Sequence, residues 1–243
     1  MIGRGLVVAA SFLTSVQGLH RRDPDVAAAT PWFPVVGALV GGVVGAVGWG
    51  VARTTSPLLG GVVAVVAGLL VTGAFHEDGL GDVADAFVGG WTPEDRLRIL
   101  GDSRHGTYGV AAICGSILVR AVALGSLAPG DVLRAAVIAH ALGRAGALVA
   151  MLVGRPAPAP GLGADYIRRL PRPRVLVALA VVGGATVALD PLRGALMVAG
   201  VVGVGVAMSA WARRKVGGVT GDALGATEQL GEIAVLLVAV ATA

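Results

Sequence analysis

The chain is poor in charged residues, aromatic residues and cysteine. Of its 243 residues, 14% are charged and 4% are aromatic. Cys114 has no second cysteine to pair with, so an internal disulfide is excluded. In water-soluble domains about a quarter of the residues carry charge. The scarcity of charge therefore argues against a soluble domain.

Apolar residues and glycine are abundant instead. Hydrophobic residues make up 55% of the chain, the mean hydropathy is +0.81, and there are 39 glycines. The apolar runs are far longer than strands and do not alternate with polar residues, which favours helices. Glycine and alanine let such helices approach closely in a bilayer. The sequence predicts an all-α, polytopic membrane protein in which residues 1–243 form a single domain.

Hydropathy predicts about seven spans and a shorter N-terminal helix. The spans are expected at residues 31–52, 57–75, 107–127, 132–153, 175–189 and 194–211, with a last one after the glycine-rich loop 217–225. The apolar run at 5–19 is shorter than the ~20 residues that a bilayer requires, so we predict an interfacial or re-entrant helix, with a true span as the alternative. Prolines and arginines predict an extended loop at 154–174.

The basic residues of the loops predict the orientation. One side receives the loops that carry Arg4, Arg21, Arg22, Arg96, Arg98, Arg104, Arg155, Arg168, Arg169, Arg172, Arg174, Arg213, Arg214 and Lys215. The other side is expected to have only Arg53 and Arg193. Basic loops stay in the cytoplasm, so the first side is cytoplasmic and the C-terminus lies outside. The pI near 10.2 reflects these arginines beside the membrane, and no nucleic-acid partner is expected.

The polar segment 76–109 is where acidic residues gather. On a helix, Asp78, Asp82 and Asp85 would share one face, within an arc of about 60°. Carboxylates so close repel one another unless a cation is present, and hard oxygen ligands suit Mg²⁺ or Mn²⁺. No basic residue occurs between positions 54 and 95, unlike an ordinary solvated helix face. We therefore predict a metal site, with a solvated face as the alternative.

Polar groups around these acids are further candidates. His76 and His105 flank them and are expected to be polar neighbours, because hard cations prefer oxygen. Thr92-Pro93-Glu94-Asp95 predicts the start of a short helix that ends near Gly101. Asp102, Ser103 and Arg104 follow, either as an ordinary turn or as a phosphate-facing arginine beside a metal-binding aspartate. Thr220-Gly221-Asp222 is either a simple helix cap or a loop whose amides approach a pyrophosphate.

Charged residues also occur inside the predicted spans. Arg144 lies well within the fourth span, with His140 one turn before it. An arginine at that depth costs at least ~2.5 kcal/mol, so it should face the bundle interior and have a partner. Glu228 and Glu232, in the last span, carry the same cost, and one of them is the expected partner. We expect a functional role for Arg144, with a structural ion pair as the alternative.

Three motifs together resemble a known family. They are His76-x-Asp78-Gly79-Leu80-x-Asp82-x-x-Asp85, then Asp102-Ser103-Arg104-x-Gly106-Thr107-x-Gly109, then Gly217-Gly218-x-Thr220-Gly221-Asp222-x-Leu224-Gly225-Ala226 with Glu232. The chain resembles cobalamin synthase, the adenosylcobinamide-GDP ribazoletransferase of the vitamin B12 pathway. The likeness runs from Ser11-Phe12-Leu13-Thr14 to the last span and includes Arg144.

The resemblance implies a catalytic transmembrane domain in the cell inner membrane. Such an enzyme joins adenosylcobinamide-GDP to α-ribazole or its 5′-phosphate and releases GMP, with Mg²⁺ as cofactor. Its partners would be these small molecules and membrane lipid, with association into a homo-oligomer or with other corrinoid enzymes as further expectations. The usual Arg-x-Pro after the N-terminal motif is replaced by Ser15-Val16-Gln17, the glycine after the third Asp by Ala86, and a polar residue by Gly101.

The same resemblance assigns roles to residues. Mg²⁺ ligands would be Asp78, Asp82 and Asp85; catalytic residues would be Asp82, Asp85, Asp102, Arg104 and Arg144; substrate-binding residues would be His76, Ser103, Gly106, Thr220, Gly221, Asp222 and Glu232. Two alternatives stay open. A CDP-alcohol phosphotransferase also uses clustered aspartates, although its Asp-Gly-x-x-Ala-Arg signature is absent. A transporter would explain charges within spans, but its site would lie near the bilayer midplane.

Overall fold

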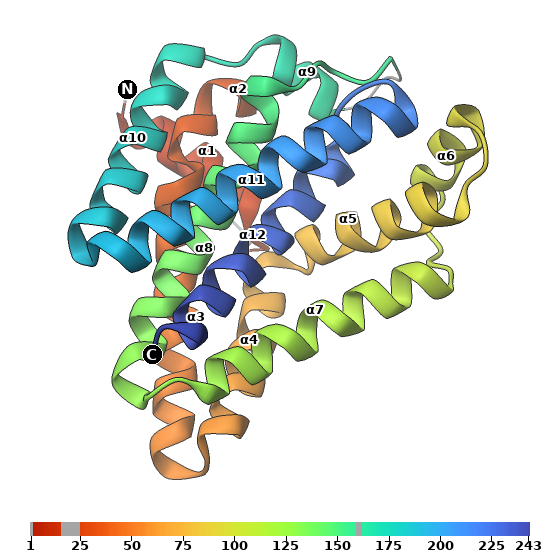
Figure 1. Ribbon diagram of the computed structural model, residues 1–243. Helices are drawn as coiled ribbons and strands as arrows, with labels where there is room; N and C mark the ends of the chain where they lie inside the picture. The colour runs from red at the N-terminus through yellow and green to blue at the C-terminus, as the bar shows by residue number, and fades with distance from the viewer. Residues whose placement is uncertain (1, 16–24, 159–161) are drawn as a thin grey trace.

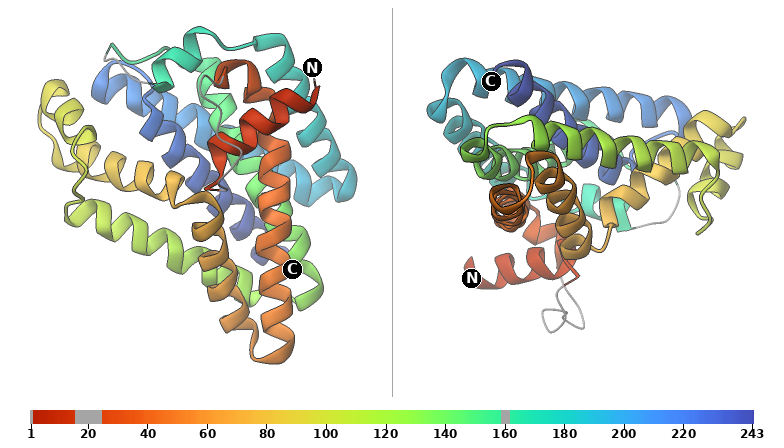
Figure 2. Two further views of the ribbon diagram at one scale, coloured as in Figure 1. Left: turned by 180° about the vertical axis from the view of Figure 1, so that it is seen from behind. Right: turned by 90° about the horizontal axis from the view of Figure 1, so that it is seen from below.

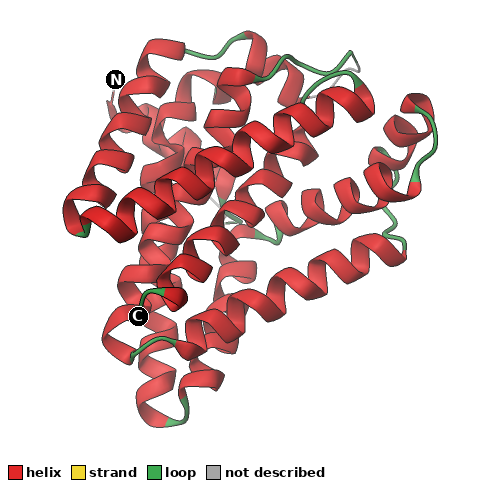
Figure 3. Cartoon of the chain, viewed as in Figure 1, coloured by secondary structure: helices red, strands yellow, loops and turns green. Residues whose placement is uncertain are grey.

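The computed structural model describes residues 2–15, 25–158 and 162–243, which fold almost entirely as helices (Figures 1 and 3). The elements are α1 (Ile2–Leu13), α2 (Val26–Ala29), η1 (Thr30–Trp32), α3 (Phe33–Thr54), α4 (Pro57–Thr72), α5 (Phe75–Ala84), η2 (Asp85–Gly89), α6 (Pro93–Leu100), α7 (Thr107–Ser126), α8 (Pro129–Val153), α9 (Leu162–Arg168), α10 (Arg172–Leu189), α11 (Pro191–Val216) and α12 (Gly221–Ala241). Within these ranges no strand forms, and the predicted all-α class is confirmed.

The long helices agree with the predicted spans. Six helices are long and apolar enough to cross a membrane, and α4 with α5 makes a seventh if that bent pair is one span. The predicted boundaries shift at some ends. α11 runs Pro191–Val216 rather than 194–211, because Asp190 caps its first turn and Arg213, Arg214 and Lys215 continue its last turn. Cations are favourable at a helix C-terminus, so the basic run does not end the helix.

The second predicted span, 57–75, ends slightly early, and a sharp bend follows it. α4 ends at Thr72, Gly73 and Ala74 both adopt left-handed backbone conformations (φ 67° and 56°), and α5 leaves at 95° to α4. Figure 1 shows α5 running away from α4 and alongside α7. A helix end leaves carbonyl groups without partners. Ser15 satisfies two of them, because its hydroxyl donates to the carbonyl of Leu70 at 2.7 Å and its amide to that of Val71 at 2.8 Å.

The N-terminal helix α1 has 12 residues, which span only ~18 Å. It is therefore too short to cross a bilayer alone, as the interfacial or re-entrant prediction required. It lies obliquely across the N-terminal part of α3 (Figure 2, left). The end of the predicted run 5–19, with Val16 and Gln17, and the basic residues Arg21 and Arg22 lie outside the described residues.

The prediction of an extended loop at 154–174 is wrong in part. Residues 162–168 form helix α9, and α10 already begins at Arg172. The prolines indicated a break in this region, but no proline occurs between positions 162 and 168, so nothing prevents a helical turn there. As a result α9 folds back over the bundle and contacts α12. The short prediction from Thr92 to Gly101 is confirmed as α6, with Thr92 as its cap.

The centre of the bundle is packed through glycine. A Cβ added at Gly37 or Gly41 of α3 would collide with a backbone carbonyl of α8, that of His140 or Ala136. α12 lies among α5, α8 and α11, and Gly225 of α12 meets the backbone of His76. Small residues at such crossings give the close van der Waals contact that holds helices together in lipid. This packing sets α5 directly against the start of α12.

Candidate active site

An acidic group lies on α5 and in the loop before α7. His105 stands between two aspartates, with its Nε2 3.3 Å from Oδ1 of Asp78 and its Nδ1 3.4 Å from Oδ1 of Asp82. One ligand atom from each residue lies within 4.8 Å of the others, as a shared metal ion would require. From the sequence, His105 was predicted only to be a polar neighbour of the acids. The structure places it as a third potential ligand.

The chemistry of this group suits a divalent cation. Among the described residues, neither Asp78 nor Asp82 forms an ion pair with an arginine or lysine, and Nδ1 of His105 is buried without a hydrogen bond. Asp82 lies on α5, outside the six helices that can cross a membrane. Burial, followed by the charges of Asp78 and Asp222, raises the pKa of Asp82 to about 7. A cation among these carboxylates would relieve that repulsion.

Asp85 is not part of this group. Its Oδ2 accepts a hydrogen bond from the Gly106 amide at 2.6 Å, and its Oδ1 accepts one from the Gly109 amide at 2.9 Å. These bonds satisfy orphan amides at the start of α7. A Cβ at Gly106 would lie 2.8 Å from the carboxylate, so glycine makes the contact possible. The structure thus gives Asp85 a positioning role, holding α7 and the His105 loop against α5.

Asp102 and Arg104 pair with each other at the surface. The Arg104 guanidinium donates to both carboxylate oxygens of Asp102, at 3.0 and 2.7 Å, and its side chain is 86% exposed. These hydrogen bonds lower the pKa of Asp102 to about 2. Ser103 between them is exposed. The structure does not bring this pair into the group formed by Asp78 and Asp82.

The glycine-rich loop leads directly into the contact between α12 and α5. Thr220 caps α12 by accepting a hydrogen bond from the Ala223 amide at 3.2 Å. A Cβ at Gly79 would lie 2.9 Å from the backbone oxygen of Asp222, so the two helices cross there. This crossing brings Asp222 close enough to influence the charge of Asp82. The first turn of α12 therefore faces the acidic group.

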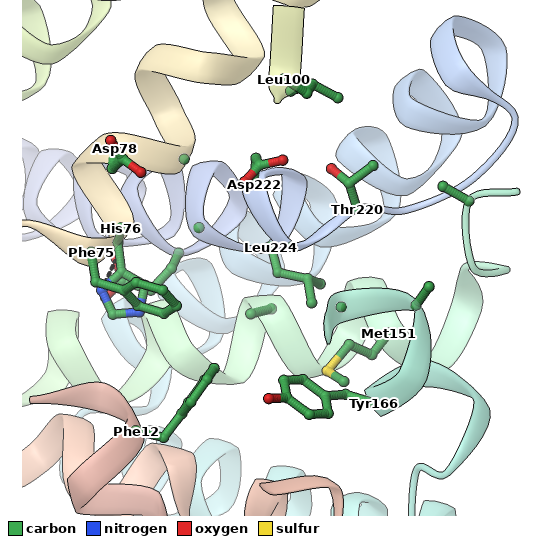
Figure 4. Close-up of a pocket in the computed structure, with 18 of the residues that line it drawn as sticks. Phe12, Phe75, His76, Asp78, Leu100, Met151, Tyr166, Thr220, Asp222 and Leu224 are labelled. Carbon is green, nitrogen blue, oxygen red and sulfur yellow. Dashed lines mark ion pairs between the residues drawn. The ribbon is translucent and has the colours of Figure 1, made fainter. Parts of the chain in front are cut away.

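A chamber of about 390 Å³ opens beside this crossing. Its polar lining includes Asp78, Thr220 and Asp222, and its apolar lining includes Phe12 and Tyr166. In Figure 4 Asp78, Asp222 and Thr220 lie on one side of the chamber, and the rings of Phe12 and Tyr166 lie on the other. Asp78 belongs both to the chamber and to the candidate metal group. Metal chemistry and substrate binding can thus take place next to each other.

Behind the chamber lies a buried charge network. The Arg144 guanidinium donates to Glu228 and, at 2.7 Å, to Glu232, so the predicted partner of Arg144 is confirmed with both glutamates engaged. Arg120, which the sequence analysis overlooked, donates to Glu232 at 3.1 Å and to Glu77 at 2.7 Å. All five side chains are at most 5% exposed. Arg120 lies within a predicted span, so the rule that singled out Arg144 would also have found it.

The network contains a second possible metal group, made of His140, Glu228 and Glu232. Here the cationic position is already filled, because the Arg144 guanidinium reaches both glutamates. His140 also pairs with Glu232, and His76 lies 3.7 Å from Glu228. Each glutamate of the network therefore has an arginine partner, whereas Asp78 and Asp82 have none among the described residues.

The chain matches known proteins over almost its whole length. A family model described as cobalamin-5-phosphate synthase matches residues 5–240. This chain belongs to that family. A relative from Ralstonia pickettii, named adenosylcobinamide-GDP ribazoletransferase, is 40% identical over 94% of this chain and 88% of its own. One of the same name from Bradyrhizobium diazoefficiens is 40% identical over 97% of this chain and 93% of its own. No solved structure matches the chain.

The match to the cobalamin-5-phosphate synthase family covers every part of the site. The matched residues extend from α1, which supplies Phe12, to α12, which supplies Asp222 and Glu232. The acidic group, the glycine loop and the buried network are thus all contained in the region that this family shares.

Proposed function

We propose that this protein is a Mg²⁺-dependent adenosylcobinamide-GDP ribazoletransferase. It joins adenosylcobinamide-GDP to α-ribazole or its 5′-phosphate, and GMP is released. The observation that carries the proposal is the Asp78–Asp82–His105 group beside the first turn of α12, at a chamber large enough for a small substrate. The relatives' shared name supports the same reaction. The shared name of the relatives favours this function over that of a CDP-alcohol phosphotransferase or a transporter.

The reaction exchanges one phosphorus–oxygen bond for another. A ribose hydroxyl oxygen of the ribazole attacks the phosphorus attached to the corrinoid, and GMP leaves with the bridging oxygen. Asp78, Asp82 and His105 would hold Mg²⁺, which supplies charge neutralisation for the pyrophosphate and the departing GMP. The backbone amide of Gly221 lies at the start of α12, and the N-terminus of a helix attracts anionic oxygens.

The hydroxyl group must also lose its proton. We propose that Asp222 accepts this proton, because its carboxylate lines the chamber but is not one of the three potential metal ligands. Arg104 is proposed to bind phosphate, and its exposure lets it exchange Asp102 for a substrate oxygen. Asp85 keeps the His105 loop in place through the amides of Gly106 and Gly109.

We place the chain in the inner membrane with this site at the cytoplasmic face. Around the site, α6 carries Arg96 and Arg98, and α11 ends in Arg213, Arg214 and Lys215. Arg96 also donates to the Lys215 carbonyl at 3.3 Å, which ties the two basic segments together. Basic segments of this kind remain in the cytoplasm. Tags within 88–92 and 160–165 are therefore expected to be cytoplasmic, and a periplasmic tag at either place would overturn this orientation.

The direct test is GMP release by the purified protein in lipid. Adenosylcobinamide-GDP, α-ribazole and Mg²⁺ are supplied together, and each is omitted in turn. We expect stoichiometric formation of GMP and the joined corrinoid only when all three are present. CMP release from a CDP-alcohol without GMP release from adenosylcobinamide-GDP would favour the phosphotransferase alternative.

A further inference from the structure

The chamber has two chemically different walls. The residues that line it include Phe12 on α1, Phe75 on α5 and Tyr166 on α9, whose aromatic rings come from separate elements. The Phe12 ring centroid lies 5.3 Å from that of Phe75 and 5.5 Å from that of Tyr166, both edge to face. The polar wall carries Thr220 and Asp222, as Figure 4 shows. The occupant should therefore have an apolar aromatic part and a polar part.

The volume limits that occupant further. About 390 Å³ is within the range of pockets that enclose one small organic molecule. A corrin ring with its side chains is far larger than such a molecule, so this chamber cannot enclose it. α-Ribazole fits the description, because it is a riboside whose base, dimethylbenzimidazole, is flat and apolar.

We propose that the chamber is the binding site for the ribazole substrate, with its base against Phe12, Phe75 and Tyr166. Its ribose then lies towards Asp78 and Asp222. This inference rests on the proposed function and adds where the acceptor binds and what recognises its base. The corrinoid remains outside, with only its pyrophosphate reaching the acidic group.

The orientation agrees with the chemistry required. A base on the aromatic wall directs the ribose hydroxyls to the polar wall, next to the group of Asp78, Asp82 and His105. Aromatic rings prefer edge-to-face or offset contacts with another ring, and the cluster offers such surfaces. Arg144 also lines the chamber, and its buried Nε has no hydrogen-bond partner among the described residues. It therefore offers one donor to an acceptor nitrogen on the base.

This arrangement makes α1 part of the chamber wall. Phe12 is in contact with three aromatic rings, the third being Phe33 at 5.8 Å. Ser15, just after α1, is fixed to the end of α4 by its hydrogen bonds to Leu70 and Val71. The helix is thus held as one wall of the chamber, although it is too short to span the bilayer.

The test separates the Michaelis constants of the two substrates in the full-length protein. Phe12→Leu keeps most of the volume but removes the ring, and Tyr166→Ala removes the neighbouring ring on the same wall. For each variant we expect the KM for α-ribazole to rise about tenfold, the scale of one lost aromatic contact. The KM for adenosylcobinamide-GDP should change less than about twofold, because the corrinoid does not enter the chamber. A rise in the corrinoid KM alone would overturn the inference.

A matched control is Phe87→Leu. Phe87 is fully buried against Trp211 but does not line the chamber. It should show how much a lost ring affects the fold while leaving the KM for α-ribazole unchanged. If Phe87→Leu raised this KM as much as Phe12→Leu does, the effect would be one of general packing and the proposal would fail.

A second measurement needs no variant. Free 5,6-dimethylbenzimidazole should inhibit the wild-type protein competitively with α-ribazole and not with adenosylcobinamide-GDP. Equilibrium dialysis should show that α-ribazole binds without the corrinoid. Inhibition competitive with the corrinoid substrate would contradict the inference. Absence of GMP release under every condition would instead contradict the proposed function, so the two failures are distinguishable.

Discussion

Glu77 and Asp78 are neighbours on α5, yet they belong to two different groups of charges. The Glu77 side chain is 4% exposed and accepts a hydrogen bond from Arg120 inside the bundle. The Asp78 side chain is 66% exposed and faces His105 at the edge of the chamber. The inner group contains two arginines for its three glutamates, whereas no arginine or lysine within residues 2–15, 25–158 and 162–243 pairs with the outer group.

The difference indicates which carboxylates are available for chemistry. A buried glutamate that is paired with arginine has its charge balanced, and disturbing it mainly affects the fold. An aspartate without a cationic partner can accept a metal ion at little cost. Glu77 is therefore expected to serve architecture and Asp78 to serve catalysis, although a single residue step separates them.

The largest effect is expected from breaking the inner group. Arg144→Met leaves Glu228 buried without its main cation, which should destabilise the fold by about 3–5 kcal/mol. Size-exclusion profiles and thermal melts in detergent should show loss of monodisperse protein. Adding Glu228→Gln to Arg144→Met should recover part of the loss. Strictly additive losses in this double-mutant cycle would mean that the two residues do not act as a pair.

A different outcome is expected when the outer group is changed. Asp78→Asn and Asp82→Asn keep the size of the side chain but remove its charge, so GMP release should fall at least ~10²-fold. Folding should be retained, because neither carboxylate has an arginine or lysine partner among the described residues whose charge would be left unpaired. Asp131→Asn is a control, since the Asp131 side chain is 43% exposed and, within the described part of the chain, forms an ion pair with Arg134 alone, at 2.9 Å. Normal turnover in either outer variant would show that the metal assignment is wrong.

Asp85 is a third case, because its carboxylate is bound by backbone amides. In Asp85→Asn the amide group can accept one backbone hydrogen bond, but its NH₂ faces another donor, a defect that costs about 1–3 kcal/mol. We expect a lower melting temperature and a smaller loss of turnover than in Asp82→Asn. The Mg²⁺ concentration for half-maximal activity should change little. A large increase in that concentration would instead make Asp85 a ligand.

The Mg²⁺ requirement of the outer group should depend on pH. The pKa of Asp82 is raised to about 7, so below that pH a proton competes with the cation for this carboxylate. As pH falls from 7 to 6, the Mg²⁺ concentration for half-maximal activity should rise by up to about tenfold. Above pH 8 it should become constant. A requirement for Mg²⁺ that is unchanged from pH 6 to 8 would contradict proton competition at this site.

Much of the fold could be predicted from the sequence, because each span is a long apolar run and hydropathy locates such runs directly. The helix cap at Thr92 and the partner of Arg144 were also predictable, since a polar group in a helix start or a membrane requires a specific partner. The bend after α4 was not. Gly73 is an ordinary signal for a helix end, but an alanine gives no sign of the left-handed conformation that Ala74 adopts.

The candidate site was predicted in composition more accurately than in arrangement. Helical spacing correctly put Asp78 and Asp82 together on α5. It also grouped Asp85 with them, because spacing carries no information about the α7 amides that Asp85 accepts from. His105 comes from a loop, and its position between the two aspartates depends on how α7 packs against α5. The aromatic wall joins α1, α5 and α9, which only the folded chain brings together.

Mn²⁺ binding measured by electron paramagnetic resonance tests the central claim most directly. Mn²⁺ prefers the same oxygen ligands as Mg²⁺, and the purified protein can be titrated without either substrate. The account predicts that Asp78→Asn and Asp82→Asn abolish saturable Mn²⁺ binding, whereas Glu228→Gln, in the other possible metal group, retains it. Retained binding in Asp82→Asn together with loss in a folded Glu228→Gln protein would place the metal in the buried network and contradict the account.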